Sequence, residues 1–107
     1  MSPSAYVLTV AAETDLREII RYTHAHWGDA QVRRYVSKLE QGIARLAARQ
    51  GRFAELSKLH PALIMSRCEH HYIFCLHRDE EPALIIAILH ERMNAVARVA
   101  NRLIEDA

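Results

Sequence analysis

A cluster of ionisable side chains follows the most apolar run of the sequence. In "ILHERMN" (88–94), a histidine, a glutamate and an arginine come directly after the apolar residues 83–89. A metal-free ribonuclease needs a general base, a general acid and a cation near the phosphate, and these residue types supply all three. Six such residues fall at or near predicted strand ends and could converge on one edge of a sheet: Arg67, His71, Arg78, His90, Glu91 and Arg92.

The same cluster also has a purely structural interpretation. Long polar side chains commonly end buried strands, and a strand-end histidine can donate a hydrogen bond to nearby backbone. We favour this interpretation for His90 and expect no catalytic residue in the cluster. If the protein is instead a ribonuclease, Arg67 and His90 are the first candidates for catalytic residues.

Other catalytic and cofactor signatures are missing from the sequence. The seven histidines include no i, i+4 pair and there is no Cys-x-x-Cys, so no zinc motif is present. The three glycines stand alone, which excludes a glycine-rich phosphate loop, and no Gly-x-Ser-x-Gly occurs. We therefore predict no bound metal and no cofactor.

Composition limits the class of protein. The chain has 107 residues, enough for a single domain (1–107), and half of them are hydrophobic. Fourteen Lys and Arg balance thirteen Asp and Glu, which argues against sequence-specific nucleic-acid binding by the chain itself. No signal-type N-terminus and no apolar run of about 18 residues is present, so we expect a cytoplasmic protein without a membrane segment.

Periodicity predicts the secondary structure. Residues 6–10 are rich in β-formers, and three-and-four spacing of apolar residues follows over about 12–27 and from Asp29 to about Arg49. Gly28 can take the left-handed conformation between these helices, Asp29 can cap the second, and Gly42 allows close packing, most simply between helices. A connection with at most one helical turn (51–61) leads to three strands (62–67, 71–78 and 83–90), and Asn94 can cap a final helix.

This order predicts an α+β fold. The arrangement β-α-α-β-β-β-α places an antiparallel sheet on a helical hairpin, and the C-terminal helix covers part of the other face. Residues 83–89 show no polar alternation, so that strand should be internal. A tight turn near Glu69 would pair Cys68 with His71 and Cys75 with Ile64, which keeps the two thiols apart and argues against a disulfide.

Two surfaces suit a protein partner. Arg98 and Arg102 are four apart, and we predict that they form a basic strip opposite the apolar stripe of Val96, Val99, Ala100, Leu103 and Ile104, although such strips are often only solvated surface. On the helical hairpin, Trp27 and Tyr35, with Ile20 and Tyr22, add more apolar surface than a helix pair over a small sheet needs to bury. An uncovered apolar groove there would bind an amphipathic segment.

Together these segments resemble the ParE branch of the RelE/ParE toxin superfamily of bacterial type II toxin–antitoxin modules. The similar stretches are "YVLTVAAETDLREIIRYTHAHWG", the positions of Gln31 and Tyr35, "HHYIFCLH", and "ILHERMN" followed by "RVANRL". They span nearly the whole chain. Two positions depart from the pattern: Asn94 stands where many relatives have aspartate, and Val10 where a proline is common.

The resemblance implies a function. It implies a toxin neutralised by a small ParD-like antitoxin, commonly one with a ribbon-helix-helix DNA-binding part and a C-terminal segment that wraps the toxin. It further implies inhibition of DNA gyrase by binding, with Arg98 and Arg102 as candidate target contacts and Trp27 and Tyr35 as candidate antitoxin contacts. Two alternatives stay open: a ribosome-dependent mRNA endoribonuclease of RelE type, which the near-neutral charge disfavours, and a non-toxic relative that only binds its antitoxin.

Overall fold

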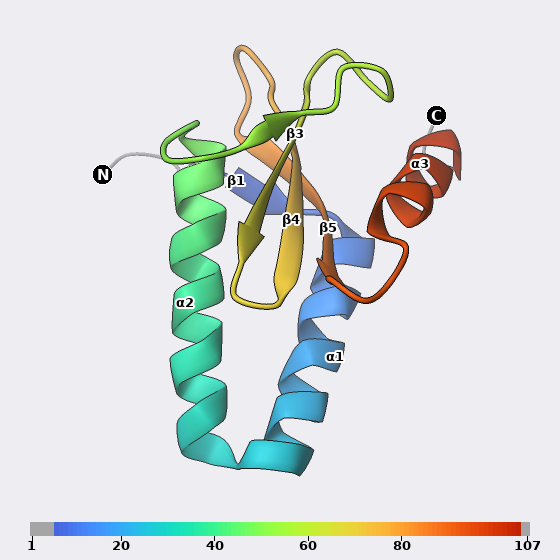
Figure 1. Cartoon of the computed structure of the whole chain (residues 1–107). Helices are drawn as coiled ribbons and strands as arrows, with labels where there is room; N and C mark the ends of the chain where they lie inside the picture. The colour runs from blue at the N-terminus through green and yellow to red at the C-terminus, as the bar shows by residue number, and fades with distance from the viewer. Residues whose placement is uncertain (1–5, 106–107) are drawn as a thin grey trace.

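A computed structural model describes residues 6–105 and confirms the α+β fold (Figure 1). In chain order the described elements are β1 (Tyr6–Leu8), α1 (Val10–Trp27), α2 (Asp29–Ala47), β2 (Ala54–Glu55), β3 (Leu63–Cys68), β4 (His71–Leu76), β5 (Ala83–His90) and α3 (Ala95–Glu105). None of the helices in this range is long and apolar enough to cross a membrane.

The sheet has the strand order β1-β5-β4-β3-β2. Strands β3, β4 and β5 form the predicted antiparallel meander, whereas β1 pairs with β5 in parallel. A parallel neighbour requires a long connection, and here the helical hairpin and the meander supply it. The short edge strand β2 was not predicted, because two residues paired with Ile64 and Met65 are too few to show a pattern.

Strand β5 is internal, as predicted, and is covered on both faces. One face packs against α1 and α2 through Ile85 and Ile88, and the other packs against α3 through Ala87 and Leu89. A bulge lets Phe74 oppose Ala87 while Cys75 opposes Ile85, which leaves an extra residue in β5. Burial on both sides and the bulge together explain the missing alternation.

The first helix begins earlier than predicted. Thr9 ends the strand segment and caps α1, since its Oγ1 accepts the amide of Ala12 at 3.1 Å. Gly28 has φ +83°, the positive angle expected between the two helices. Asp29 makes no side-chain cap for α2 and instead contacts His24 at 2.7 Å, so that expectation was wrong.

Gly42 permits a close approach, but of the sheet instead of another helix. A Cβ at this position would lie 2.9 Å from Sγ and 3.1 Å from Cβ of Cys68 on β3. The predicted register is confirmed, with Cys68 opposite His71 and Cys75 opposite Ile64. Both cysteines are free thiols.

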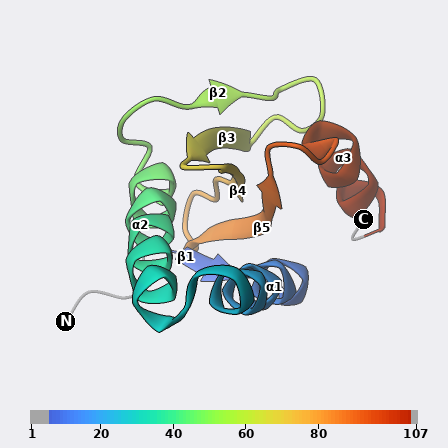
Figure 2. The ribbon, with the colours of Figure 1, turned by 60° about the horizontal axis from the view of Figure 1, so that its bottom comes forward.

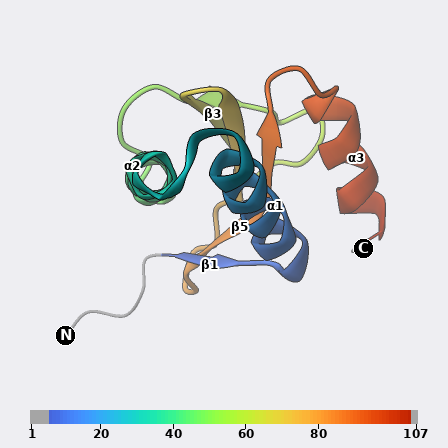
Figure 3. The same cartoon turned by 90° about the horizontal axis from the view of Figure 1, so that it is seen from below.

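The last helix packs on the face of the sheet away from the hairpin, as Figures 2 and 3 show. Its buried stripe contains Ala95 and Val99, with Leu103 partly buried. Val96 and Ile104, which we placed in that stripe, are exposed. The helix is rotated from the predicted orientation because Arg102 points inward and bonds to α1 and β5.

Candidate functional site

A groove of about 740 Å³ opens where the ends of β4 and β5 meet the inner sides of α1 and α2. We call it the hairpin groove. Its apolar wall includes Ile19, Tyr22, Trp27 and Met93. Trp27 is 71% exposed and Tyr22 is 62% exposed, which is unusual for side chains of this size. The predicted uncovered apolar surface is therefore present, and both Trp27 and Tyr35 line it.

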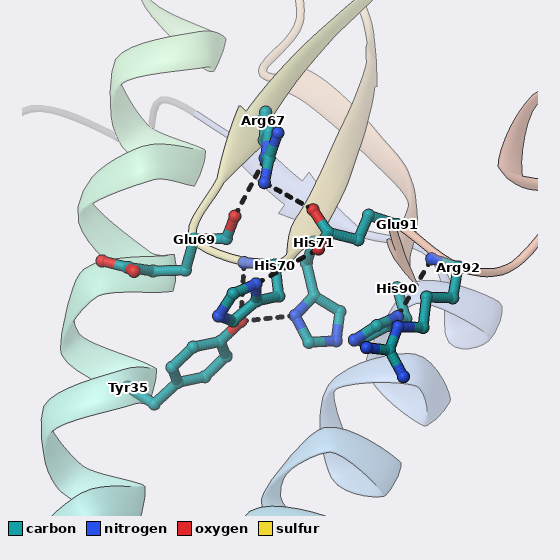
Figure 4. A network of polar contacts seen from close by, with 8 residues as sticks. All are labelled: Tyr35, Arg67, Glu69, His70, His71, His90, Glu91 and Arg92. Carbon is teal, nitrogen blue, oxygen red and sulfur yellow. Dashed lines mark hydrogen bonds and ion pairs between the residues drawn. The ribbon is translucent and has the colours of Figure 1, made fainter.

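The floor of the groove carries a histidine bonded to a tyrosine (Figure 4). Tyr35 Oη lies 2.6 Å from Nδ1 of His71 and accepts the amide N–H of His70 at 3.2 Å. Because the hydroxyl oxygen is already an acceptor, we assign its proton to the bond with His71. This bond joins α2 to the start of β4.

Both members of that bond are neutral near pH 7. Burial lowers the pKa of His71 to about 4, and the neighbouring His90 and His70 act in the same direction. Burial also raises the pKa of Tyr35, which the hydrogen bond from the His70 amide only partly offsets. A neutral histidine whose Nδ1 is engaged and whose side chain is buried is poorly placed as a general base.

Beside this pair, three charged or polar side chains form a closed network. Arg67 Nη2 lies 2.6 Å from Glu91, and its Nε donates to the carbonyl of Glu69 at 3.1 Å. His70 Nδ1 contacts the other oxygen of Glu91 at 3.2 Å. The hydrogen bond from His70 and the charge of Arg67 hold the pKa of the Glu91 carboxyl below its usual range. The cation and the carboxylate thus neutralise each other.

His90 ends β5 as the structural interpretation requires, although the hydrogen bond runs in the opposite direction. Its Nδ1 accepts the backbone amide of Arg92 at 3.0 Å, so the ring is an acceptor where we expected a donor. The ring also packs edge-on against His71, with centroids 5.2 Å apart. This side chain therefore closes the turn after β5.

Five of the six residues predicted to converge do so, and Arg78 does not. It follows β4 at the opposite end of the sheet, where its guanidinium donates to the carbonyl of Pro82 at 2.6 and 2.8 Å. The prediction failed for Arg78 because adjacent antiparallel strands end at alternate edges. Within residues 6–105, no three His, Cys, Asp or Glu side chains are arranged to hold a metal ion.

We predicted that Arg98 and Arg102 form an exposed basic strip on α3, and the prediction is wrong for Arg102. Arg98 is exposed, but Arg102 reaches under the helix and makes a bidentate ion pair with Asp15 of α1 at 2.7 Å. Asp15 also accepts the amide of Ile88 at 2.9 Å, and Arg102 donates to the carbonyl of Ile86 at 2.9 Å.

The two side chains of this ion pair bond to backbone groups of β5 that a neighbouring strand would otherwise bond. Strand β1 pairs with β5 only as far as Ile85, so the edge of β5 beyond it has backbone groups without a strand partner. Asp15 and Arg102 satisfy two of them and join α1, β5 and α3. Sequence reasoning missed Asp15, although a lone acid among the apolar positions of α1 was a usable signal.

Comparison with known proteins agrees with this geometry. Residues 6–95 match the profile described as the ParE toxin of type II toxin–antitoxin system, parDE. The chain is 66% identical over 100 residues to "Toxin ParE" of Escherichia coli, covering 94% of this chain and 97% of that protein. It is 29% identical over 91 residues to "Toxin ParE1" of Mycobacterium tuberculosis, covering 85% and 93% respectively.

A solved structure shares the fold. The "Chromosomal ParDE TA system from P. aeruginosa" contains a chain that superposes with a TM-score of 0.64 at 18% identity, over 81% of this chain and 95% of that one. The two chains therefore share one small α+β fold. The chain belongs to the ParE toxin family of type II toxin–antitoxin systems.

Proposed function

We propose that this protein is the toxin of a type II module, that an amphipathic segment of a ParD-like antitoxin occupies the hairpin groove, and that the toxin inhibits DNA gyrase by binding. The proposal rests on the contrast, within the hairpin groove, between exposed apolar side chains and polar side chains that are already bonded. An exposed apolar wall suits a partner segment, while the polar groups beside it bond to one another.

The antitoxin contact is assigned to Trp27 and Tyr35. Large aromatic side chains supply much of the binding energy at interfaces, and Trp27 stands exposed at the rim of the groove. Tyr35 lies deeper, where its ring can support a partner while its hydroxyl stays bonded to His71. A helix or extended segment with apolar residues on one face fits such a wall.

The gyrase contact is assigned to α3, with different roles for its two arginines. Arg98 presents its charge to solvent and is the candidate direct contact. Arg102 fixes the orientation of the helix through Asp15, so that it supports the contact from behind. Gyrase as the target is what the resemblance to the ParE branch implies, and the assignment of the contact to α3 is ours.

Action without catalysis is supported by the state of the ribonuclease candidates. Arg67 is in an ion pair with Glu91, and the Nδ1 of His90 is occupied by the amide of Arg92. Neither is prearranged as a free cation or base for a phosphate ester. We therefore propose a binding inhibitor and not an mRNA endoribonuclease.

Two assays run side by side test the proposal. Purified protein is added to DNA gyrase with relaxed plasmid, and to ribosomes programmed with mRNA. We expect loss of supercoiling or accumulation of cleaved plasmid in the first and intact mRNA in the second. Intact supercoiling together with cut mRNA would replace the proposal by the ribonuclease alternative, and no effect in either assay would favour the non-toxic relative.

A further inference from the structure

A second concave site lies on the other side of α2, away from the hairpin groove. It measures about 470 Å³ and is formed by the C-terminal half of α2, the loop after it and the end of β3, which run side by side in Figure 1. We call it the α2–β3 hollow. Four cationic side chains and one carboxylate line it: Lys38, Arg45, Arg52, Arg67 and Glu69. Neither the proposed antitoxin contact nor the proposed gyrase contact uses this surface.

Two of these cations have no carboxylate partner among the described residues. Lys38 contacts Glu69 at 3.1 Å, and Arg67 is paired with Glu91. Among residues 6–105, by contrast, no carboxylate lies within ion-pair distance of Arg45 or Arg52. Two guanidinium groups without an ion pair to any described residue thus line one concave surface, in a chain whose formal net charge is only +1.

The neighbouring Arg49 shows that this is not a general property of the segment. Its guanidinium lies 3.6 Å from Glu55 and 5.5 Å from the ring centroid of Phe53. Arg49 does not line the hollow, whereas the arginines four before and three after it do. Of the three arginines in this segment, the one outside the hollow is therefore paired, whereas Arg45 and Arg52 have no carboxylate partner among residues 6–105.

The C-terminal end of α2, which would ordinarily repel an anion, is closed by local hydrogen bonds. The carbonyls of Ala44, Arg45 and Leu46 accept the amides of residues 48, 50 and 49 at 2.9–3.1 Å. Bonded carbonyls project less negative potential than free ones. Gln41, Gln50 and Ser66 add neutral hydrogen-bonding groups to the lining.

We propose that the α2–β3 hollow binds a phosphate group, held between Arg45 and Arg52. Guanidinium groups bind phosphate oxygens in a bidentate manner, and two of them around a concave surface match a tetrahedral dianion better than a planar carboxylate. The described lining has no aromatic side chain to stack on a base, so recognition is of the phosphate and not of a nucleobase. The phosphate belongs either to a small polyphosphate or to the backbone of a nucleic acid.

The probes are sodium tripolyphosphate and a 12-base-pair duplex DNA of arbitrary sequence, titrated into the full-length protein and followed by amide chemical shifts. We expect shifts at residues 38–52 and 66–69 with the hairpin groove unaffected. The variant R45Q/R52Q should weaken binding at least about tenfold, because two charge-assisted contacts are lost. The control R17Q/R21Q removes two exposed arginines from α1 and should bind as the wild type does.

The two probes separate the sources of the phosphate. If both probes bind at the hollow, its natural ligand is the phosphate backbone of a nucleic acid. The affinity for the duplex should then fall as the salt concentration rises. Binding of tripolyphosphate alone assigns it to a small phosphorylated ligand. Shifts spread evenly over the surface, equal weakening in the two double variants, or no shift at all would overturn the proposal. Unchanged antitoxin affinity of R45Q/R52Q shows that the variant is folded.

Discussion

Asp15 and Arg102, 87 residues apart in sequence, form a bidentate ion pair with both contacts at 2.7 Å. The carboxylate comes from α1 and the guanidinium from α3, and each also bonds the backbone of β5. The pair therefore fixes α3, to which we assign the gyrase contact, against α1, which forms one wall of the hairpin groove. Its side chains are mostly buried, so removing either one takes a close, charge-assisted contact away from the other.

Loss of either partner should destabilise the fold. For Asp15→Asn or Arg102→Gln we expect the free energy of unfolding to fall by about 3 kcal/mol. Urea denaturation monitored by circular dichroism measures it. Arg98→Gln, on the same helix but exposed, serves as the control and should change stability by less than about 0.5 kcal/mol. Equal stability of all three variants would show that the ion pair contributes nothing to the fold.

Gly42→Ala tests the contact between α2 and β3. Alanine favours a helix by up to about 1 kcal/mol over glycine, but its Cβ would sit 2.9 Å from Cys68 Sγ, so we expect a net loss of about 1–3 kcal/mol. The double variant Gly42→Ala/Cys68→Ala should recover part of that loss, because the sulfur is gone. Ser37→Ala, exposed on the same helix, is the control. A Gly42→Ala protein as stable as the wild type would contradict the close contact.

Stability should depend on pH through His71. Its pKa is about 4 in the folded protein, against 6.5 for an unperturbed histidine, so between these values the unfolded chain binds a proton that the folded chain does not. Stability therefore falls as pH drops from 6.5 to 4, by about 2–3 kcal/mol in total. His71→Asn, whose Oδ1 can still accept from Tyr35, should flatten this slope, and the exposed His26→Asn should keep it. The lowered pKa of Glu91 also reduces stability as pH falls, but only from around the ordinary value of 4.5 downward, so it overlaps the acidic end of this range alone.

Trp27→Ala should weaken antitoxin binding without harming the fold. The side chain is 71% exposed, so the change in stability should stay within about 0.5 kcal/mol, while the dissociation constant rises about thirtyfold or more. Isothermal titration with the antitoxin measures the affinity. Val10→Ala, at an apolar position that is 81% exposed and outside the groove, should bind normally. If the two variants bind alike, the antitoxin does not use this wall.

Much of the fold was predictable because it depends on local pattern. The two long helices, the meander, the internal β5 and the register at the cysteines all follow from periodicity and turn residues. The orientation of α3 was not predictable in the same way. Its apolar positions allow more than one rotation, and the ion pair between Arg102 and Asp15 selects the one observed.

The candidate site was predicted in part for a related reason. Strand-end positions brought Arg67, His71 and His90 together, but grouping Arg78 with them overlooked that it follows the strand that His71 begins and so lies at the opposite end of the sheet. The bond between Tyr35 and His71 joins residues 36 apart and has no local signature. Exposure of Trp27 could be anticipated only from an excess of apolar surface on the hairpin.

The most direct test of the central claim, inhibition by binding, is a supercoiling assay in which the protein is titrated against a fixed amount of gyrase. We expect inhibition to follow the molar ratio of protein to gyrase, to be reversed by the antitoxin, and to be unchanged within a few fold in His90→Gln. Full supercoiling with excess folded protein would contradict the gyrase assignment. Inhibition lost in a folded His90→Gln variant would contradict action without catalysis.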